Sequence, residues 1–217
     1  MFRPNRDVGI KVPRVLDVDK DVVTSVRRRR RGEELRGAIC QAVLEELEVH
    51  GFAAMTMEAV AARAGAGKAT LYRHWSSKVR LVVAALEYSA PEIIVPADSG
   101  DLRGEILAVL RQIAAALVGP SGAAARGLIA EIVRSPELAS AMKPFLADPT
   151  TPPMLEVLRR AAVRGDIPVA ALTRRIAGVG TDLLRQYVLI NGEIPVGVVE
   201  EIVDQVVMPL LRGLALR

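Results

Sequence analysis

Residues 55–82 read MTMEAVAARAGAGKATLYRHWSSKVRLV, and this stretch predicts a pair of short helices. Thr56 is a good N-cap, and the apolar residues spaced three and four apart after it predict a helix of about two turns. Residues 65–67 form a tight connection, because glycine adopts backbone angles that are closed to other residues. A second short helix is predicted from residue 68 to about residue 75. Two short helices joined by a tight turn are typical of a helix-turn-helix, although simple packing in an all-helical protein produces the same pattern.

Further helices are predicted on both sides of this unit. An amphipathic helix from residue 33 to residue 50 precedes it, and Gly51 ends that helix. A fourth helix begins after a cap at Ser76 or Ser77 and runs to about Ser89, where prolines follow. No stretch alternates with period two for long enough to form a strand. We therefore predict an all-α fold of about nine to ten helices, the later ones near residues 101–118, 122–134, 136–147, 152–164, 168–190 and 196–215.

The composition suits a folded chain with aliphatic cores. Of the 217 residues, 51% are hydrophobic and 25% charged, a balance that argues against a largely disordered protein, and only 3% are aromatic. No charge-poor apolar stretch reaches the roughly 18 to 20 residues that span a bilayer, and the N-terminus lacks the apolar segment of a secretory signal. The sequence therefore predicts a cytoplasmic protein. Its one cysteine, Cys40, predicts neither an intrachain disulfide nor a thiolate metal cluster.

Positive charge gathers at the N-terminal end of the chain. Residues 1–31 carry ten Lys and Arg against four Asp and Glu, residues 32–80 carry six of each, and residues 81–217 carry thirteen against fifteen, which gives +6, 0 and −2. Such a distribution favours a polyanionic partner at that end. We predict a flexible basic arm over residues 1–31, in which Arg29 and Arg30 contact DNA. A solvated, disordered leader explains the same charge run equally well.

The second short helix carries the candidate chemistry. With 3.6 residues per turn, Leu71 and Trp75 share one face and are predicted to pack against the preceding helices. Small residues at the helix start suit entry into a major groove, while longer polar groups reach phosphates or base edges. Lys78 adds a cation at the start of the next helix, whose free N–H groups favour phosphate. An ordinary solvated face is the alternative interpretation. The residues left to meet DNA are Lys68, Ala69, Thr70, Tyr72, Arg73 and His74.

Residues 35–86 resemble the N-terminal domain of the tetracycline-repressor (TetR) family. The resemblance rests on a Thr-capped helix, A-x-x-A-G, the turn, then K-x-T-L-Y-x-H-W and a lysine after a serine. It implies that Thr56 touches phosphate at the N-terminus of the second helix. It also implies a DNA-binding domain over residues 32–80 and a ligand-binding and dimerisation domain over residues 81–217. The implied base contacts are Lys68, Ala69 and Thr70, and the implied backbone contacts are Tyr72, His74 and Lys78.

Two positions depart from the family pattern. Gly67 stands where a Ser or Thr usually caps the recognition helix, which puts a DNA contact from that position in doubt. Val79 stands where an acidic residue is common, a change of less consequence.

The resemblance implies that the last two helices pair with those of a second chain in a four-helix bundle. Both helices carry apolar stripes that need a partner, and a helix-turn-helix dimer must place two recognition helices about 34 Å apart. Gly178 and Gly180 would let helices approach closely, although packing within one chain explains the same stripes. We predict a homodimer with an interface that includes Leu172, Ile176, Val179, Leu183, Tyr187, Val199, Ile202, Val206 and Leu210.

We also predict a pocket for an unknown small-molecule effector among the central helices, although most of its candidate residues are equally well explained as core. The predicted function is a ligand-responsive, sequence-specific DNA-binding transcriptional regulator. The resemblance favours a repressor that its effector releases from a palindromic operator on double-stranded DNA. The candidate pocket residues are Leu110, Ile113, Ala114, Met142, Phe145, Leu158 and Leu183.

Two other classes of function compete with this prediction. An enzyme lacks parts: the two histidines are not at metal-ligand spacing, no nucleophile motif is present, and the turn AGAGK lacks the strand and spacing of a phosphate-binding loop. We therefore predict no catalytic activity, no cofactor and no metal. A helical adaptor or architectural DNA binder keeps the basic N-terminal half and discriminates little between an operator and random DNA.

Overall fold

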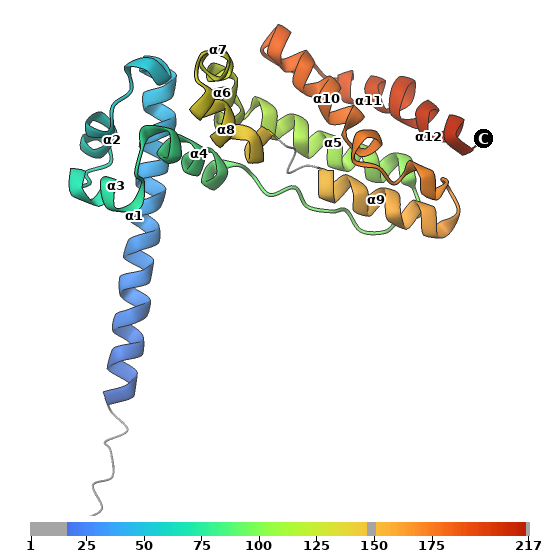
Figure 1. The fold of residues 1–217 in the computed structure, drawn as a ribbon. Coiled ribbons are helices and arrows are strands. Elements are labelled where there is room, and N and C mark those ends of the chain that lie inside the picture. Colours follow the sequence, from blue (N-terminus) through green and yellow to red (C-terminus); the bar gives the residue numbers. More distant parts are fainter. Residues whose placement is uncertain (1–16, 147–150, 216–217) are drawn as a thin grey trace, which may run out of the picture. The chain divides into compact units, whose positions relative to one another are not determined.

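The computed structural model describes the backbone of residues 17–146 and 151–215, and the side chains of residues 32–143 and 152–214. Every regular element in these ranges is helical, so the predicted all-α fold is confirmed (Figure 1). Residues 120–134 and 198–215 each form a nearly continuous helical run. If each run counts as one helix, the described residues contain ten helices, in agreement with the prediction.

The first helix, α1 (Asp17–Ala54), begins well before the predicted start at residue 33. The backbone of residues 17–31, which we expected to lack regular structure, is therefore helical. The side chains of Arg29 and Arg30 lie outside the described residues. The chain divides into two units between residues 37 and 38, within α1. At Gly51 the helix is interrupted by a φ of 70°, the left-handed region that glycine tolerates, which agrees with the predicted stop there.

Three short helices follow, as predicted: α2 (Met57–Arg63), α3 (Lys68–His74) and α4 (Lys78–Ser89). The hydroxyl of Thr56 caps α2 by accepting from the amide of Ala59 at 3.1 Å. The cap of α4 is Ser77 rather than Ser76, because the Ser77 hydroxyl accepts from the amide of Arg80 at 3.3 Å. The connection between α2 and α3 turns at Gly65 with a φ of 62°. The predicted helix-turn-helix is therefore present.

The apolar residues of α1 to α4 form one cluster, which we call the N-terminal core. It also takes in residues of α6 (Pro120–Gly127), α7 (Ile129–Arg134) and α8 (Pro136–Leu146), and α4 packs against α6 and α8. The residues of α4 thus share a core with the helix-turn-helix, so apolar packing does not divide at the predicted domain boundary after residue 80. The largest fully buried members of this core are Ile39, Met55, Leu71, Leu81, Leu86, Leu128, Leu138 and Met142.

A second cluster, which we call the C-terminal core, joins α5 (Leu102–Val118), α9 (Thr151–Arg164), α10 (Arg174–Asn191) and the final helical run. That run consists of α11 (Val198–Ile202), a π-helical turn η2 (Val203–Val207) and α12 (Met208–Ala215). The predicted helix at 168–190 instead opens with a 3₁₀ turn, η1 (Val169–Ala171), and α10 starts after a Thr173 cap.

Helices α10 and α5 approach closely at Gly180. A Cβ atom at this position would lie 2.8 Å from Cδ1 of Leu110 on α5 and 3.4 Å from Cγ2 of Val207. Leu110 is fully buried, so its side chain has little room to move. The close helix approach that we predicted for Gly180 therefore occurs within one chain.

The segment between α4 and α5 is attached to the C-terminal core by side chains. The amide of Gln112 donates to the carbonyl of Ile94 and accepts from the Ile94 N–H, both at 2.9 Å. Arg160 of α9 donates to the carbonyl of Pro96 at 2.8 Å. The buried carboxylate of Glu105 accepts from the amides of Ser99 and Gly100. This connection, residues 90–101, is therefore attached to α5 and α9, and we call it the strap.

Among the described helices, none alone is long and apolar enough to cross a membrane. One pair, Leu102–Val118 with Pro120–Arg134, reaches the required length and composition only when taken together across a bend of 60°.

Candidate nucleic-acid interface and ligand cavity

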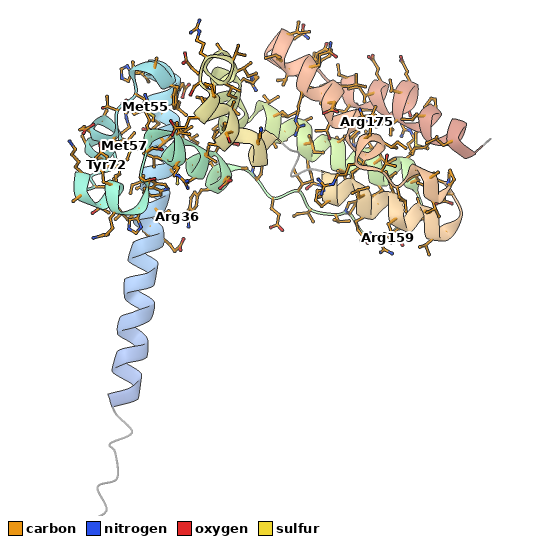
Figure 2. The ribbon with its side chains drawn as sticks, in the orientation of Figure 1. Arg36, Met55, Met57, Tyr72, Arg159 and Arg175 are labelled. Atoms are coloured by element: carbon orange, nitrogen blue, oxygen red, sulfur yellow. The ribbon has the colours of Figure 1, made fainter. Side chains whose placement is uncertain are left out.

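The recognition helix α3 presents most of its polar side chains to solvent. Leu71 is fully buried in the N-terminal core, as predicted, and Trp75 is half-buried against it. Tyr72 is 47% exposed on α3, which packs on α2 (Figure 2). Since Leu71 fixes the inward face, the opposite face is set by helical geometry. The predicted DNA contacts Lys68, Ala69, Arg73 and His74 are exposed and Thr70 is half-buried.

The carboxylate of Glu58 meets two of these side chains. Glu58 lies in the first turn of α2; it pairs with the ammonium of Lys68 and accepts a 3.4 Å hydrogen bond from the hydroxyl of Tyr72. The Lys68 Nζ also lies 5.8 Å from the centroid of the Tyr72 ring. The Lys68 contact lowers the pKa of Glu58, and the same contact raises the pKa of Lys68. Sequence reasoning missed Glu58, because only the folded turn brings residue 58 next to residues 68 and 72.

Thr56 is exposed at the N-terminus of α2, where the resemblance places a phosphate contact. Its hydroxyl oxygen accepts the capping bond from Ala59, and a hydroxyl that accepts still has its hydrogen to donate. The cap and a phosphate contact are therefore compatible at this residue.

Lys78 does not point its charge at an open phosphate site. Its Nζ donates to the carbonyls of Phe52 at 2.8 Å, Met55 at 3.1 Å and Ala53 at 3.4 Å, and lies 4.4 Å from the centroid of the Phe52 ring. An ammonium has three N–H donors, and these three carbonyls use them all. They belong to the end of α1 and the turn before α2, where helical carbonyls lack partners. We therefore correct the prediction for this side chain: Lys78 ties α4 to α1.

A buried carboxylate attaches α2 to α1. Glu46 of α1 is 4% exposed, and its Oε1 accepts from Nε of Arg63 at 2.8 Å and Nη2 of Arg63 at 2.7 Å. This hydrogen bonding to Glu46 raises the pKa of Arg63. A second carboxylate, Glu45, lies 3.5 Å from the same guanidinium. Arg63 is therefore used within the fold and positions α2 for the recognition helix.

A cavity of about 610 Å³ lies where α4, the strap, α5, α6 and α10 meet. Its wall is largely aliphatic, and polar groups are contributed by Glu87 of α4, Glu92 of the strap and Gln186 of α10. Arg126 also lines the cavity and donates to the carbonyl of Leu117. The volume is in the range of small-molecule sites in proteins.

The sequence located this cavity poorly. Ile113 is the one predicted pocket residue found in its wall among those whose side chains the structure describes. Leu110, Ala114 and Leu158 belong to the C-terminal core, and Met142 belongs to the N-terminal core. Leu183 packs against the C-terminal core, and the side chain of Phe145 is outside the described residues.

The predicted dimer-interface residues fall into two groups, those that are buried within one chain and those that keep exposed surface. Val199 and Ile202 are buried in the C-terminal core and are not available to a second chain. Leu172, Ile176 and Leu183 are half-buried against the same core. Apolar surface remains on the outer side of both helices, where Val206 is 38% and Ile190 70% exposed. The other predicted interface residues, Val179, Tyr187 and Leu210, are half-buried.

The chain combines a helix-turn-helix, whose recognition helix exposes polar side chains, with a larger helical region that contains a cavity. This combination is typical of DNA-binding transcriptional regulators. Two family models match this chain: residues 39–85 match "Bacterial regulatory proteins, tetR family", and residues 96–206 match "Tetracyclin repressor-like, C-terminal domain". The chain belongs to the TetR family of bacterial transcriptional regulators.

Individual relatives agree with this membership. An HTH-type transcriptional regulator of Mycobacterium tuberculosis is 33% identical over 173 residues, which cover 77% of this chain and 83% of the relative. A DNA-binding transcriptional repressor of Mycobacteroides abscessus is 32% identical over 190 residues, covering 84% of this chain and 96% of the relative. A TetR-family regulator of Mesorhizobium loti has a similar structure with a TM-score of 0.62 at 19% identity, covering 85% of this chain and 96% of that chain.

Proposed function

We propose that this TetR-family regulator is a homodimeric repressor that binds a palindromic operator and is released from it by a small-molecule effector. The observation that carries the proposal is the exposed polar face of α3, which is held in register by buried Leu71. The Mycobacteroides abscessus relative is a DNA-binding transcriptional repressor, which supports repression. The proposal includes a cytoplasmic location, because a bacterial operator lies there.

In this proposal, residues at the start of α3 read base edges while later residues hold phosphates. Lys68, Ala69 and Thr70 occupy the first turn of α3, and small side chains there allow a close approach to the major groove. Thr56 and the backbone N–H groups at the start of α4 bind phosphate, because both lie at helix N-termini. The remaining backbone contacts are made by Tyr72, Arg73 and His74 of α3, and by Arg29 and Arg30 of α1.

The second chain pairs through the outer side of α10 and the final helical run. Val179, Tyr187, Val206 and Leu210 keep apolar surface there that is not fully covered within one chain. Two recognition helices about 34 Å apart then meet successive major grooves on one side of the duplex. An inverted repeat in the operator follows from the two-fold symmetry of such a dimer.

Helix α4 connects the cavity to the helix-turn-helix. At one end Lys78 donates to carbonyls of Phe52 and Met55, and at the other end Glu87 lines the cavity. A ligand that favours one position of the Glu87 end would move the Lys78 end with it, because a 12-residue helix is stiff. Effector binding in the cavity would then change the spacing of the two recognition helices and lower operator affinity.

The test is in-vitro selection from a random duplex library with the full chain at about 150 mM salt, near physiological ionic strength. We expect an inverted repeat, and the Thr70→Ala variant should relax the preference at one position of each half-site by about 1 to 3 kcal/mol. Ser140→Ala, which removes an exposed hydroxyl from α8 away from the proposed DNA surface, serves as the matched control. Selection of no motif, with binding that disappears as salt rises, would favour an architectural DNA binder instead.

The selected motif also makes the effector testable, because it points to target genes and hence to candidate ligands. A ligand that fills the cavity should weaken operator binding. If a bound ligand at saturation leaves operator affinity unchanged, the coupling through α4 is wrong.

A further inference from the structure

The surface formed by α2 and α3 carries one acidic residue, and it is attached to the residues proposed to meet DNA. The sequences of these helices are MEAVAAR and KATLYRH, so Glu58 is the only carboxylate they contain. The Glu58 side chain is 50% and the Lys68 side chain 61% exposed. Glu58 pairs with Lys68 and accepts from the Tyr72 hydroxyl at 3.4 Å. One carboxylate therefore holds an ammonium and a phenol of the recognition helix.

Fold stability explains little of this arrangement. Ion pairs between exposed side chains contribute at most about 1 kcal/mol, because water and salt screen them. An acidic residue in the first turn of α2 interacts favourably with the helix dipole, but this effect needs no contact with Lys68 or Tyr72. Against DNA, in contrast, an exposed carboxylate is costly, since it repels phosphates and cancels the charge of its partner. The position of Glu58 is thus better explained by what it does to Lys68.

We propose that Glu58 is a specificity-determining residue that holds the Lys68 ammonium and so withholds it from indiscriminate contact with phosphate. Lys68 then adds little to binding of random DNA and is available at the operator, where base edges replace the carboxylate as its partner. Glu58 also orients the Tyr72 hydroxyl toward α2. The proposal rests on the proposed function only in that Lys68 lies at the DNA surface.

The raised pKa of Lys68 and the lowered pKa of Glu58 agree with a pair that stays charged near neutral pH. Both pKa shifts have their mutual hydrogen bond as the largest cause. Salt therefore acts on this pair by screening and not by changing its protonation.

The experiment is a double-mutant cycle on the full chain with a random-sequence duplex, with Kd measured by fluorescence anisotropy at several salt concentrations. Glu58→Gln should tighten random binding about threefold to tenfold and steepen the salt slope by about 0.9, the contribution of one further phosphate contact. Lys68→Ala alone should change the salt slope little. In the Lys68→Ala background, Glu58→Gln should no longer tighten binding of random DNA or steepen the salt slope. Glu48→Gln, which removes an exposed carboxylate from α1, is the control for net charge.

Two results would overturn the proposal. One is an equal loss of slope from Lys68→Ala with and without Glu58→Gln; the other is a gain as large from Glu48→Gln as from Glu58→Gln. Thermal denaturation of each variant establishes that all are folded. Selection of an operator tests the proposed function separately: a cycle that behaves as expected in a protein that selects no motif would leave Glu58 holding Lys68 away from phosphate, whereas its role in specificity and the proposed sequence-specific regulation would both be wrong.

Discussion

The two apolar cores of this chain are held together by different means. In the N-terminal core, α2 and α3 have seven residues each, and polar side chains fix the unit: Arg63 binds buried Glu46, and Lys78 binds carbonyls at the end of α1. In the C-terminal core, longer helices interlock through aliphatic side chains and meet closely at Gly180. Helices of about two turns are unstable in isolation, so the short pair needs its cross-links.

This difference predicts which kinds of substitution destabilise each region. The N-terminal region depends on a few directional contacts, and removing one leaves a buried charge or a row of carbonyls without a partner. The helices of the C-terminal region depend mainly on volume, so they should respond to a single added methyl group inside, whereas polar contacts such as those of buried Glu105 attach the segment before α5. The exposed polar side chains of α3 are therefore positioned by contacts that a single polar substitution can remove.

The largest effect is expected from Lys78→Ala. This change removes three hydrogen bonds from a charged donor to carbonyls at the end of α1 and in the turn that follows it, at a cost of about 3 kcal/mol. Chemical denaturation followed by circular dichroism measures it. DNA binding should weaken on every sequence because α4 loses its attachment to α1. If stability is unchanged while the salt slope of DNA binding falls by the value of one contact, Lys78 is a phosphate ligand and the comparison between the two cores loses its main support.

The matching test in the C-terminal core is Gly180→Val. Its Cβ would lie 2.8 Å from the Leu110 side chain, and overpacking of a buried contact costs about 1 to 3 kcal/mol. The urea midpoint should fall, with operator affinity per folded molecule retained. Gly127→Val is the control, since nothing lies within 4 Å of a Cβ there. Equal losses from both variants would mean that helix preference, and not close packing, sets the effect.

The recognition unit could be predicted from sequence because its signals are local. Thr56 caps α2, whose apolar residues show a helical period within seven residues. The four-residue spacing of Leu71 and Trp75 predicts that Leu71 faces inward. The resemblance to the TetR family relies on the same short stretch. Apart from the starts of α1 and α10, the other helix ends were predicted within a few residues for a similar reason: prolines and glycines mark them locally.

The contacts that sequence reasoning missed join residues that are far apart in the chain. Lys78 reaches the carbonyl of Phe52, and Glu58 reaches Lys68 across the turn. Nothing in the spacing of charges tells an internal ion pair from a DNA contact. The cavity was missed for the same reason, because its wall combines α4, the strap and α6 with α10, and an apolar stripe does not reveal its partner. The early start of α1 was missed because residues 17–31 show no sustained apolar period.

A smaller, pH-dependent effect is expected on the surface of the C-terminal region. Hydrogen bonds from Arg159 and then Arg160 lower the pKa of Glu156 from 4.5 to about 2. A carboxyl with a lowered pKa adds stability that is present above pH 4.5 and is lost as the pH falls toward 2. The melting temperature of the wild-type chain should thus fall more across this range than that of Glu156→Gln. Glu137→Gln, an exposed change on α8, should follow the wild-type curve. Parallel curves for all three would remove the Glu156 contribution.

The smallest effect concerns the cap that the recognition helix lacks. Gly67 is the N-cap of α3 with a φ of −71° and a ψ of 136°, angles that serine adopts readily, and it makes no side-chain capping bond. A Cβ there would lie 3.8 Å from the Thr70 hydroxyl, so a serine fits. Gly67→Ser should stabilise the chain by about 0.5 kcal/mol, seen as a rise of about 1 to 2 °C in melting temperature. Gly67→Ala separates the causes: it restricts the unfolded chain without adding a cap, so a rise equal to that of Gly67→Ser would assign the gain to backbone entropy. A fall in stability with serine would mean that the turn between α2 and α3 needs glycine for a reason that its backbone angles do not reveal.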